Sequence, residues 1–285
     1  MKNYTLRFFS VILSAVMLVV VLMCFETSGV YAAFNNRSAK GAKKMPRSRT
    51  IRIRARKAVK INFGKKKHTG RFYYFKIKPK KTGTITFRND YTRGDKIALC
   101  NEKKKVISRE RKKCDDYYSY KGRHKYQKVV NYGVKKGKTY YIRVRGSSGK
   151  RKAKRRSYVG SVKWTNKGVS RSGYGVRKTK AKAIKRKKTV KELFAAGNKK
   201  AQWFKITNRQ KKTKIMFRSS KNNGSIKVRI YFKSSGRWYN RTYSVYRHSG
   251  KNIITGTISK KVKHTYYLKV FPDGKTSGSY SLKWK

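Results

Sequence analysis

Short runs in which apolar and polar residues alternate recur along the chain from about residue 49 to its end. In one run, Ile51 and Ile53 alternate with Arg52 and Arg54. A period of two is typical of half-buried β-strands, whose successive side chains point to opposite faces of a sheet. The runs are separated by turns that contain Gly or Ser, and no long helical period is present. The pattern therefore predicts an all-β protein.

The same succession of runs appears twice along the chain. The matching segments are 74–77 with 203–206, 85–88 with 215–218, 96–99 with 227–230, 139–144 with 265–270, and 157–164 with 279–284. Because all of them keep one order, the chain contains an internal duplication. Strands spaced by turns then predict two tandem, jelly-roll-like β-sandwich domains at 49–166 and 181–285. A linker rich in Gly and Ser is expected at 167–180, and a basic linker at 33–48.

Residues 188–196 permit two interpretations. Val190, Leu193 and Phe194 would share one face of a short helix. The equivalent region of the first copy has the pattern of a strand, so a strand is favoured here as well.

The N-terminal segment has the features of an export signal. Lys2 and Arg7 precede an apolar run at 8–25, and Ala32 offers a small-residue cleavage site. These features predict a secretory signal peptide at 1–32, and cleavage would leave no integral membrane association. The alternative is an uncleaved membrane anchor, because the run approaches the roughly 20 residues that span a bilayer.

The strand pattern resembles that of the bacterial pre-peptidase C-terminal domain. The resemblance rests on an aromatic strand (Tyr73, Phe75 and Ile77 in the first copy), a Lys-Gly-Lys-Thr-Tyr-Tyr segment at 136–141, and a terminal Ser-Tyr strand. It covers both copies. It implies jelly-roll-like sandwiches of the kind appended to secreted peptidases, which act as accessory or substrate-binding modules. The acidic residue that commonly precedes the aromatic strand is absent, so the calcium binding of some related modules is not expected.

Composition indicates a folded chain with an extreme charge. Lys and Arg number 81 against 9 Asp and Glu, which gives a formal net charge of +72. Aromatic residues are 13% of the chain, enough to build cores that disordered basic tails lack. Solubility needs far less charge than this, and like charges across strands repel. An anionic partner would offset that repulsion, whereas the alternative is a merely solvated basic face.

The period of two places basic side chains on the outward positions of the predicted strands. With Tyr140, Ile142 and Val144 inward, Arg143 and Arg145 point outward. The candidate polyanion-binding residues are Lys76, Arg88, Arg143, Arg145, Lys163, Lys205, Arg218, Lys227, Arg229, Lys269 and Lys283. Among them, Tyr141, Trp203 and Tyr267 are candidates for stacking on sugars or bases, or for ordinary packing between strands.

Residues that could carry catalysis are few and scattered. Asp115 and Asp116 are adjacent, so on a strand they would point to opposite faces. The four histidines have no metal-ligand spacing, and no phosphate-binding or nucleophile motif is present. We therefore expect no enzyme, no cofactor and no metal site. For export to an oxidising compartment, Cys100 and Cys114 predict one disulfide, with two free thiols as the alternative.

These features together predict a secreted, non-catalytic binding protein. Its partner would be an anionic polymer such as wall teichoic acid, an acidic polysaccharide or extracellular nucleic acid. The protein would be extracellular or held electrostatically on a bacterial cell surface. The alternative, from the family resemblance, is an accessory or inhibitory partner of a secreted peptidase that binds a protein substrate such as collagen.

Overall fold

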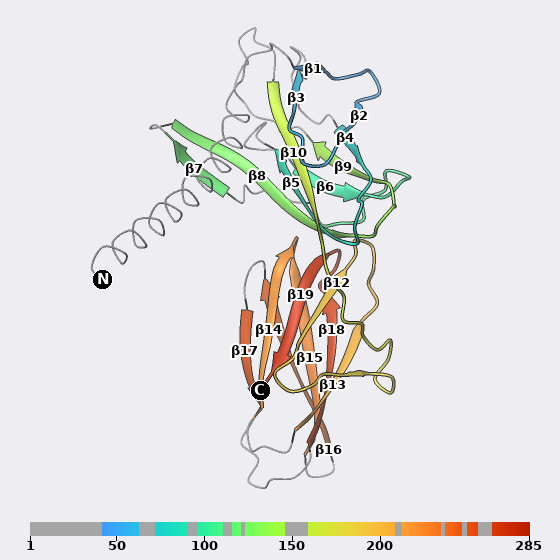
Figure 1. The fold of residues 1–285 in the computed structure, drawn as a ribbon, viewed down its shortest axis with the longest axis vertical. Coiled ribbons are helices and arrows are strands. Elements are labelled where there is room, and N and C mark those ends of the chain that lie inside the picture. The colour runs from blue at the N-terminus through green and yellow to red at the C-terminus, as the bar shows by residue number, and fades with distance from the viewer. Residues whose placement is uncertain are drawn as a thin grey trace, which may run out of the picture.

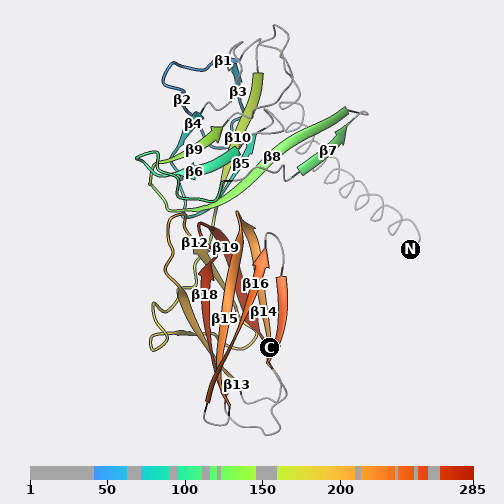
Figure 2. The ribbon, with the colours of Figure 1, turned by 180° about the vertical axis from the view of Figure 1, so that it is seen from behind.

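The computed structural model describes residues 42–62, 72–89, 96–110, 116–120, 123–145, 159–208, 213–234, 237–246, 250–255 and 264–285. These residues form strands and turns and contain no helix. The strands gather into two groups stacked end to end along the long axis of the molecule (Figures 1 and 2). The predicted all-β class with two tandem sandwiches is therefore confirmed.

Domain 1 contains two sheets. The first has six strands in the order β1 (Lys43–Lys44), β3 (Val59–Asn62), β10 (Val159–Gly168), β5 (Gly83–Asn89), β8 (Arg123–Val134) and β7 (Asp116–Tyr120). The second has four strands in the order β2 (Thr50–Arg52), β4 (Phe72–Ile77), β9 (Tyr140–Arg145) and β6 (Lys96–Cys100).

Domain 2 also contains two sheets. A five-stranded sheet has the order β11 (Lys182–Ala183), β13 (Gln202–Asn208), β18 (His264–Pro272), β15 (Ser225–Ser234) and β16 (Arg237–Tyr246). A four-stranded sheet has the order β12 (Thr189–Phe194), β19 (Gly278–Trp284), β14 (Thr213–Asn222) and β17 (Gly250–Thr255). Residues 188–196 thus contain strand β12, as expected, and not a helix.

The two domains repeat one topology. The order β2-β4-β9-β6 in domain 1 matches β11-β13-β18-β15 in domain 2, and β3-β10-β5-β8 matches β12-β19-β14-β17. Of the described strands, three lie outside this match: β1 and β7 at the two edges of the six-stranded sheet of domain 1, and β16 at the edge of the five-stranded sheet of domain 2. The duplication inferred from matching segments therefore extends to strand order.

Hydrogen bonds repeat as well, at the tryptophan that ends each copy. The indole Nε1 of Trp164 donates to the carbonyl of Ile53 at 3.1 Å, and that of Trp284 donates to Ile184 at 2.7 Å. Three residues after each isoleucine lies a residue with positive φ, Arg56 (66°) in domain 1 and Lys187 (59°) in domain 2. Their backbone N–H groups donate to the Trp164 and Trp284 carbonyls at 2.7 and 2.8 Å. Each copy therefore closes its sandwich by the same contact.

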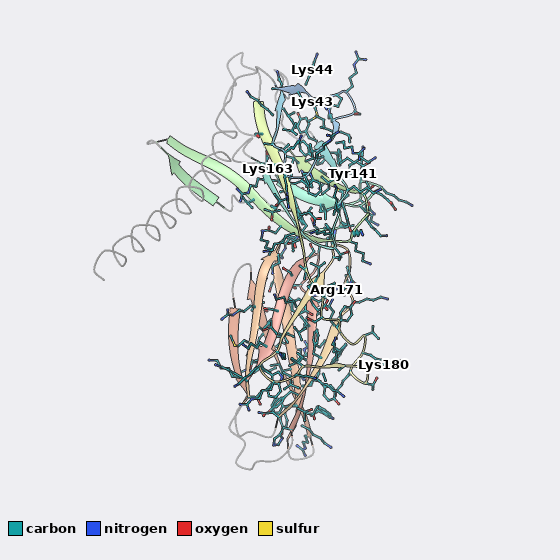
Figure 3. All side chains as sticks on the ribbon, in the orientation of Figure 1. Lys43, Lys44, Tyr141, Lys163, Arg171 and Lys180 are labelled. Carbon is teal, nitrogen blue, oxygen red and sulfur yellow. The ribbon has the colours of Figure 1, made fainter. Side chains whose placement is uncertain are left out.

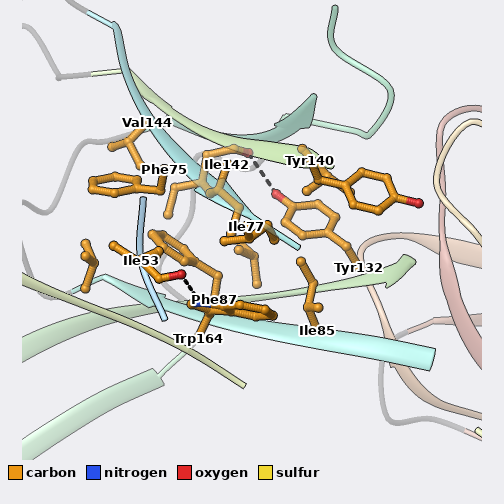
Figure 4. Close-up of a cluster of buried hydrophobic side chains, with 14 of the residues drawn as sticks. Ile53, Phe75, Ile77, Ile85, Phe87, Tyr132, Tyr140, Ile142, Val144 and Trp164 are labelled. Carbon is orange, nitrogen blue, oxygen red and sulfur yellow. Dashed lines mark hydrogen bonds between the residues drawn. The ribbon is translucent and has the colours of Figure 1, made fainter. Parts of the chain in front are cut away.

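The core of each domain lies between its two sheets. In domain 1, Phe75, Ile77 and Ile142 of the four-stranded sheet face Phe87 and Trp164 of the six-stranded sheet, and all are buried (Figure 4). The alternate residues of these strands point outward, which confirms the period-two reading: Tyr140, Ile142 and Val144 are buried, whereas Arg145 is exposed.

Both predicted linkers include residues that belong to a domain. Lys43 and Lys44, within 33–48, form β1 and pair in parallel with β3. In the predicted linker 167–180, β10 extends to Gly168, and the backbone of Gly175 pairs with that of Trp203 through bonds of 2.9 and 2.8 Å. The sequence did not identify these residues as part of a domain, because β1 has only two residues and the Gly175 pairing is an isolated bridge. Neither shows the alternation that identifies a strand in sequence.

The two domains meet through backbone contacts. Ala196 N–H donates to the Gly133 carbonyl at 2.8 Å, and Gly133 N–H donates to Ser277 Oγ at 3.2 Å. Arg109 N–H also donates to the Lys275 carbonyl at 3.2 Å. The end of β8 is therefore held directly against domain 2.

No helix within the described residues has the length and apolar character needed to cross a membrane. The predicted signal peptide at 1–32 lies outside the described residues.

Candidate functional site

Four aromatic rings lie on the outer face of the five-stranded sheet of domain 2. Trp203 is on β13, Tyr267 on β18, Tyr231 on β15 and Trp238 on β16, and we call this set the aromatic platform. On β13, β18 and β15 a neighbouring residue (Phe204, Leu268 and Ile230) is buried, so alternation turns Trp203, Tyr267 and Tyr231 outward. Trp238 pairs with Lys233, which alternates to the same face as Tyr231. Trp203 and Tyr231 stack with centroids 5.6 Å apart, and Trp238 and Tyr267 lie 5.9 Å apart.

Lys178 reaches over the platform from outside the sheet. Its ammonium Nζ lies 3.4 Å from the centroid of Trp238, 5.1 Å from that of Tyr267 and 5.5 Å from that of Tyr231. All three distances are within the range of cation–π attraction, which is strongest for Trp. A second cation, Lys269, lies 5.7 Å from the centroid of Trp203. The platform thus combines apolar ring surface with positive charge.

A buried carboxylate holds the segment that carries Lys178. Glu192 on β12 is 0% exposed, accepts a bond from Arg171 Nε at 2.9 Å, and accepts another from the Gly173 backbone N–H at 2.5 Å. The Arg171 guanidinium also lies 5.4 Å from the Tyr174 ring centroid. Together with the pairing of Gly175 to Trp203, these bonds fix residues 171–175 against domain 2. Sequence reasoning missed Lys178 because it assigned 167–180 to a linker. It missed Glu192 because the strand pattern at 188–196 does not show that Arg171 and Gly173 come to meet this carboxylate.

Domain 1 carries a smaller version of the platform at the equivalent strands. Tyr74 on β4 and Tyr141 on β9 pack edge to face with centroids 6.3 Å apart. Lys104 Nζ lies 4.9 Å from the first centroid and 5.5 Å from the second, and donates to Thr50 Oγ1 at 3.3 Å. Lys104 comes from the turn after β6, whereas Lys178 precedes β11. Two unrelated segments thus each place a lysine over outward rings of the matching sheet, and Tyr141 and Tyr267 are the equivalent residues that the two sites share.

Arginines of the same domain 1 sheet contact its remaining outward ring. The guanidinium carbons of Arg143 and Arg145 lie 4.7 and 5.5 Å from the centroid of Phe72. Arg143 also forms an ion pair of 3.0 Å with Glu110. The positive charge of Arg143 is therefore partly neutralised within the chain, whereas Arg145 is exposed.

The predicted basic residues divide between the two sheets of each domain and do not form one face. In domain 1 the four-stranded sheet carries Lys76, Arg143 and Arg145, and the six-stranded sheet carries Arg88 and Lys163. In domain 2 the five-stranded sheet carries Lys205, Lys227, Arg229 and Lys269, and the four-stranded sheet carries Arg218 and Lys283. Figure 3 labels Lys163 and Tyr141, which belong to different sheets of domain 1. Period-two alternation identifies outward positions but not the sheet that a strand joins.

Several of these cations are direct neighbours across strands. Lys163 pairs with Arg88 on adjacent strands, and Arg229 pairs with Lys269. Like charges at directly opposite positions are destabilising. Lys227 is partly neutralised by Asp273, at 3.2 Å. The aromatic candidates Tyr141, Trp203 and Tyr267 occupy outward positions as predicted, and each contacts or adjoins a cation.

The histidines and acidic residues that were considered as metal ligands form no cluster within the described part of the chain. No group of three or more His, Cys, Asp or Glu residues that could hold a metal ion occurs there. Asp115 lies outside the described residues, as does Cys114. Of the two cysteines of the predicted disulfide, the structure describes Cys100, which is a free, buried thiol. At Cys100 the structure agrees with the free-thiol alternative.

Cys100 should resist alkylation while the protein is folded. Burial raises the pKa of its thiol to about 11, so the reactive thiolate is scarce near neutral pH. We expect iodoacetamide at about pH 8 to modify Cys100 only after denaturation, as read by peptide mapping with mass spectrometry. Equal rates of Cys100 labelling in the native and denatured protein would contradict the buried position.

Comparisons with known proteins find similarity only among solved structures. No family model matches the chain, and no curated protein matches it either. The CUB1-EGF-CUB2 region of human MASP-1/3 is 8% identical with a TM-score of 0.21, covering 80% of this chain and 99% of that one. A putative secreted protein from Eubacterium rectale is 11% identical with a TM-score of 0.25, covering 80% and 72%. A CBM22 tandem domain from Paenibacillus barcinonensis is 6% identical with a TM-score of 0.19, covering 79% and 80%.

These similarities concern the tandem β-sandwich arrangement and assign no ligand to the chain. Membership of the pre-peptidase C-terminal domain family is not shown, because no family model matches.

Proposed function

We propose that this protein is an exported, non-catalytic binding protein that holds anionic polymers on its basic and aromatic sheet faces. The observation that carries the proposal is the platform of domain 2, where Lys178 lies over three outward rings of one sheet. Wall teichoic acid, acidic glycans and extracellular nucleic acid all supply the charge that such a face attracts. Binding at a bacterial surface would keep the exported protein there.

The charge balance supports an external partner. Nine acidic residues can neutralise at most nine of the 81 cations of the chain, so the great majority have no intramolecular counter-ion. Cations brought together by strand pairing, such as Arg229 and Lys269, repel each other in the free protein. A polyanion relieves this repulsion and releases its own condensed counter-ions on binding, and both effects favour the complex.

The proposal is tested by removing charge from the platform. Replacing Lys178, Lys205 and Lys269 with Gln should weaken binding of a short heparin oligosaccharide about tenfold at ~0.1 M salt. The slope of log affinity against log salt should also become shallower, because fewer counter-ions are released. Titration at several salt concentrations measures both quantities.

A matched control removes the same charge from the opposite sheet of domain 2. Lys214, Arg218 and Lys283 lie at outward positions of β14 and β19, away from the platform. Their replacement by Gln should change the affinity by less than about threefold. Equal losses in the two triple variants would show that total charge, and not the platform, governs binding.

A further inference from the structure

The outer face around the platform offers neutral hydrogen-bonding groups as well as rings and cations. Asn240 on β16 lies directly across from Tyr231, and Thr242 lies across from Arg229. Thr242 Oγ1 accepts a bond from Arg229 Nε at 2.9 Å. Thr207 and Thr265 pair across β13 and β18. Side-chain amides and hydroxyls both donate and accept hydrogen bonds, as sugar hydroxyls do.

The rings are arranged so that a ligand can lie on their common outer surface but cannot insert between them. The Trp203 and Tyr231 rings are already stacked, 27° apart, at 5.6 Å, and Trp238 and Tyr267 are in contact at 5.9 Å. A planar base that entered either pair would have to separate it. Single-stranded nucleic acid relies on open ring faces on which successive bases stack. A sugar ring needs only apolar ring surface alongside its C–H groups, with its hydroxyls reaching neighbouring polar side chains.

Lys178 favours a ligand that carries an acidic group next to Trp238. Its ammonium lies 3.4 Å from the Trp238 centroid, and an ammonium has three N–H donors that cannot all point at the ring. A sulfate or carboxylate that pairs with these donors would also lie near Tyr267 and Tyr231, whose ring centroids are 5.1 and 5.5 Å from Lys178 Nζ. A phosphodiester chain without rings could satisfy Lys178 but would leave the aromatic surface unused.

We propose that the platform of domain 2 binds an acidic polysaccharide, with a sulfate or carboxylate on Lys178 and sugar rings against Trp238 and its neighbouring rings. This assignment rests on the proposed polyanion-binding function and names the ligand class of the same site. The smaller platform of domain 1, with Lys104 over Tyr74 and Tyr141, is a second contact for the same kind of chain.

Two adjacent aromatic residues on β16 provide a matched test. Trp238 is 49% exposed and Tyr239 is 47% exposed, but successive residues of a strand point to opposite faces. Trp238 belongs to the platform, whereas Tyr239 stacks on Phe232 with centroids 5.6 Å apart. Replacing Trp238 with Ala therefore removes platform surface, and replacing Tyr239 with Ala removes similarly exposed aromatic surface elsewhere.

The experiment measures the affinity of the whole protein for a heparin oligosaccharide, a polyphosphate of similar charge and a single-stranded oligothymidine. Trp238→Ala should weaken heparin binding about tenfold while polyphosphate binding changes less than about twofold, because heparin loses the ring surface that its sugars contact and polyphosphate has no sugar ring. Trp238→Phe should recover part of the loss, and Tyr239→Ala should leave all three affinities within about twofold. Thermal melts of each variant verify the fold.

Three results would overturn the assignment. An equal loss for heparin and polyphosphate, or no loss for either, would leave polyanion binding standing but remove the sugar-stacking role of Trp238. A loss confined to oligothymidine would assign the platform to nucleic acid. Failure of the unsubstituted protein to bind either heparin or polyphosphate at low salt would refute the proposed function itself.

Discussion

Replacing Gly133 with Ala should lower the melting temperature of the protein and uncouple the unfolding of its two domains. A Cβ built at Gly133 would lie 2.1 Å from the Phe194 carbonyl oxygen and 2.9 Å from the Gly278 nitrogen. Both are backbone atoms of domain 2, which cannot rotate away as a side chain can. The junction must therefore open, at a cost of about 2–4 kcal/mol.

The opening would also break hydrogen bonds that now cross the junction. Gly133 donates to Ser277 Oγ and accepts from Ala196 N–H, and neither bond survives a shift of the β8 end away from domain 2. Calorimetry should replace one cooperative transition by two, or broaden it. Gly168→Ala is the control, because its Cβ would meet only the Lys81 side chain, at 3.2 Å. A Gly133→Ala variant that melts like Gly168→Ala would refute the close junction.

Replacing Glu192 with Ala should lower both the free energy of unfolding and the affinity for heparin. Removing the carboxylate leaves the Gly173 N–H without its acceptor and the Arg171 guanidinium without its counter-ion. Breaking a buried ion pair costs about 3–5 kcal/mol, but Arg171 is 39% exposed and can turn to water, so we expect about 2–3 kcal/mol. Urea denaturation measures this loss.

The binding effect follows because residues 171–175 precede Lys178. Once they loosen, Lys178 is no longer held over Trp238, and heparin affinity should fall although no platform residue has changed. Glu192→Gln is the matched variant. Its amide oxygen can still accept from Gly173, so it should lose less stability than the Ala variant. Unchanged stability and heparin affinity in Glu192→Ala would contradict the anchoring role.

Much of the fold was predictable because strands such as β4, β9 and β13 alternate between core and solvent. Residues such as Ile142 and Arg143 take opposite faces whatever sheet they join, and the repeated order of segments predicted a repeated topology. The strand at 189–194 was predictable only through its equivalent in the other copy, since its own apolar spacing also suits a helix.

The candidate site was predictable in part. Outward Tyr141, Trp203 and Tyr267 follow from alternation, but the division of the basic residues between two sheets depends on strand pairings between distant parts of the chain. Lys178 and Lys104 lie in irregular segments without a period. Glu192 is buried on a strand where alternation alone would not reveal that Arg171 and Gly173 come to meet it.

The most direct test of anion binding by the folded protein is its melting temperature with and without an anionic polymer. At low salt, a saturating acidic polysaccharide that binds only the folded state should add about 2.7 kcal/mol at a hundredfold excess over its dissociation constant. Sodium chloride alone should raise the melting temperature of the free protein, because screening at about 0.1 M shortens repulsion between cations to roughly 10 Å. The gain from the polymer should fade as salt is added, because anionic contacts weaken with ionic strength. A melting temperature that responds neither to the polymer nor to salt would contradict electrostatic binding as the function of this protein.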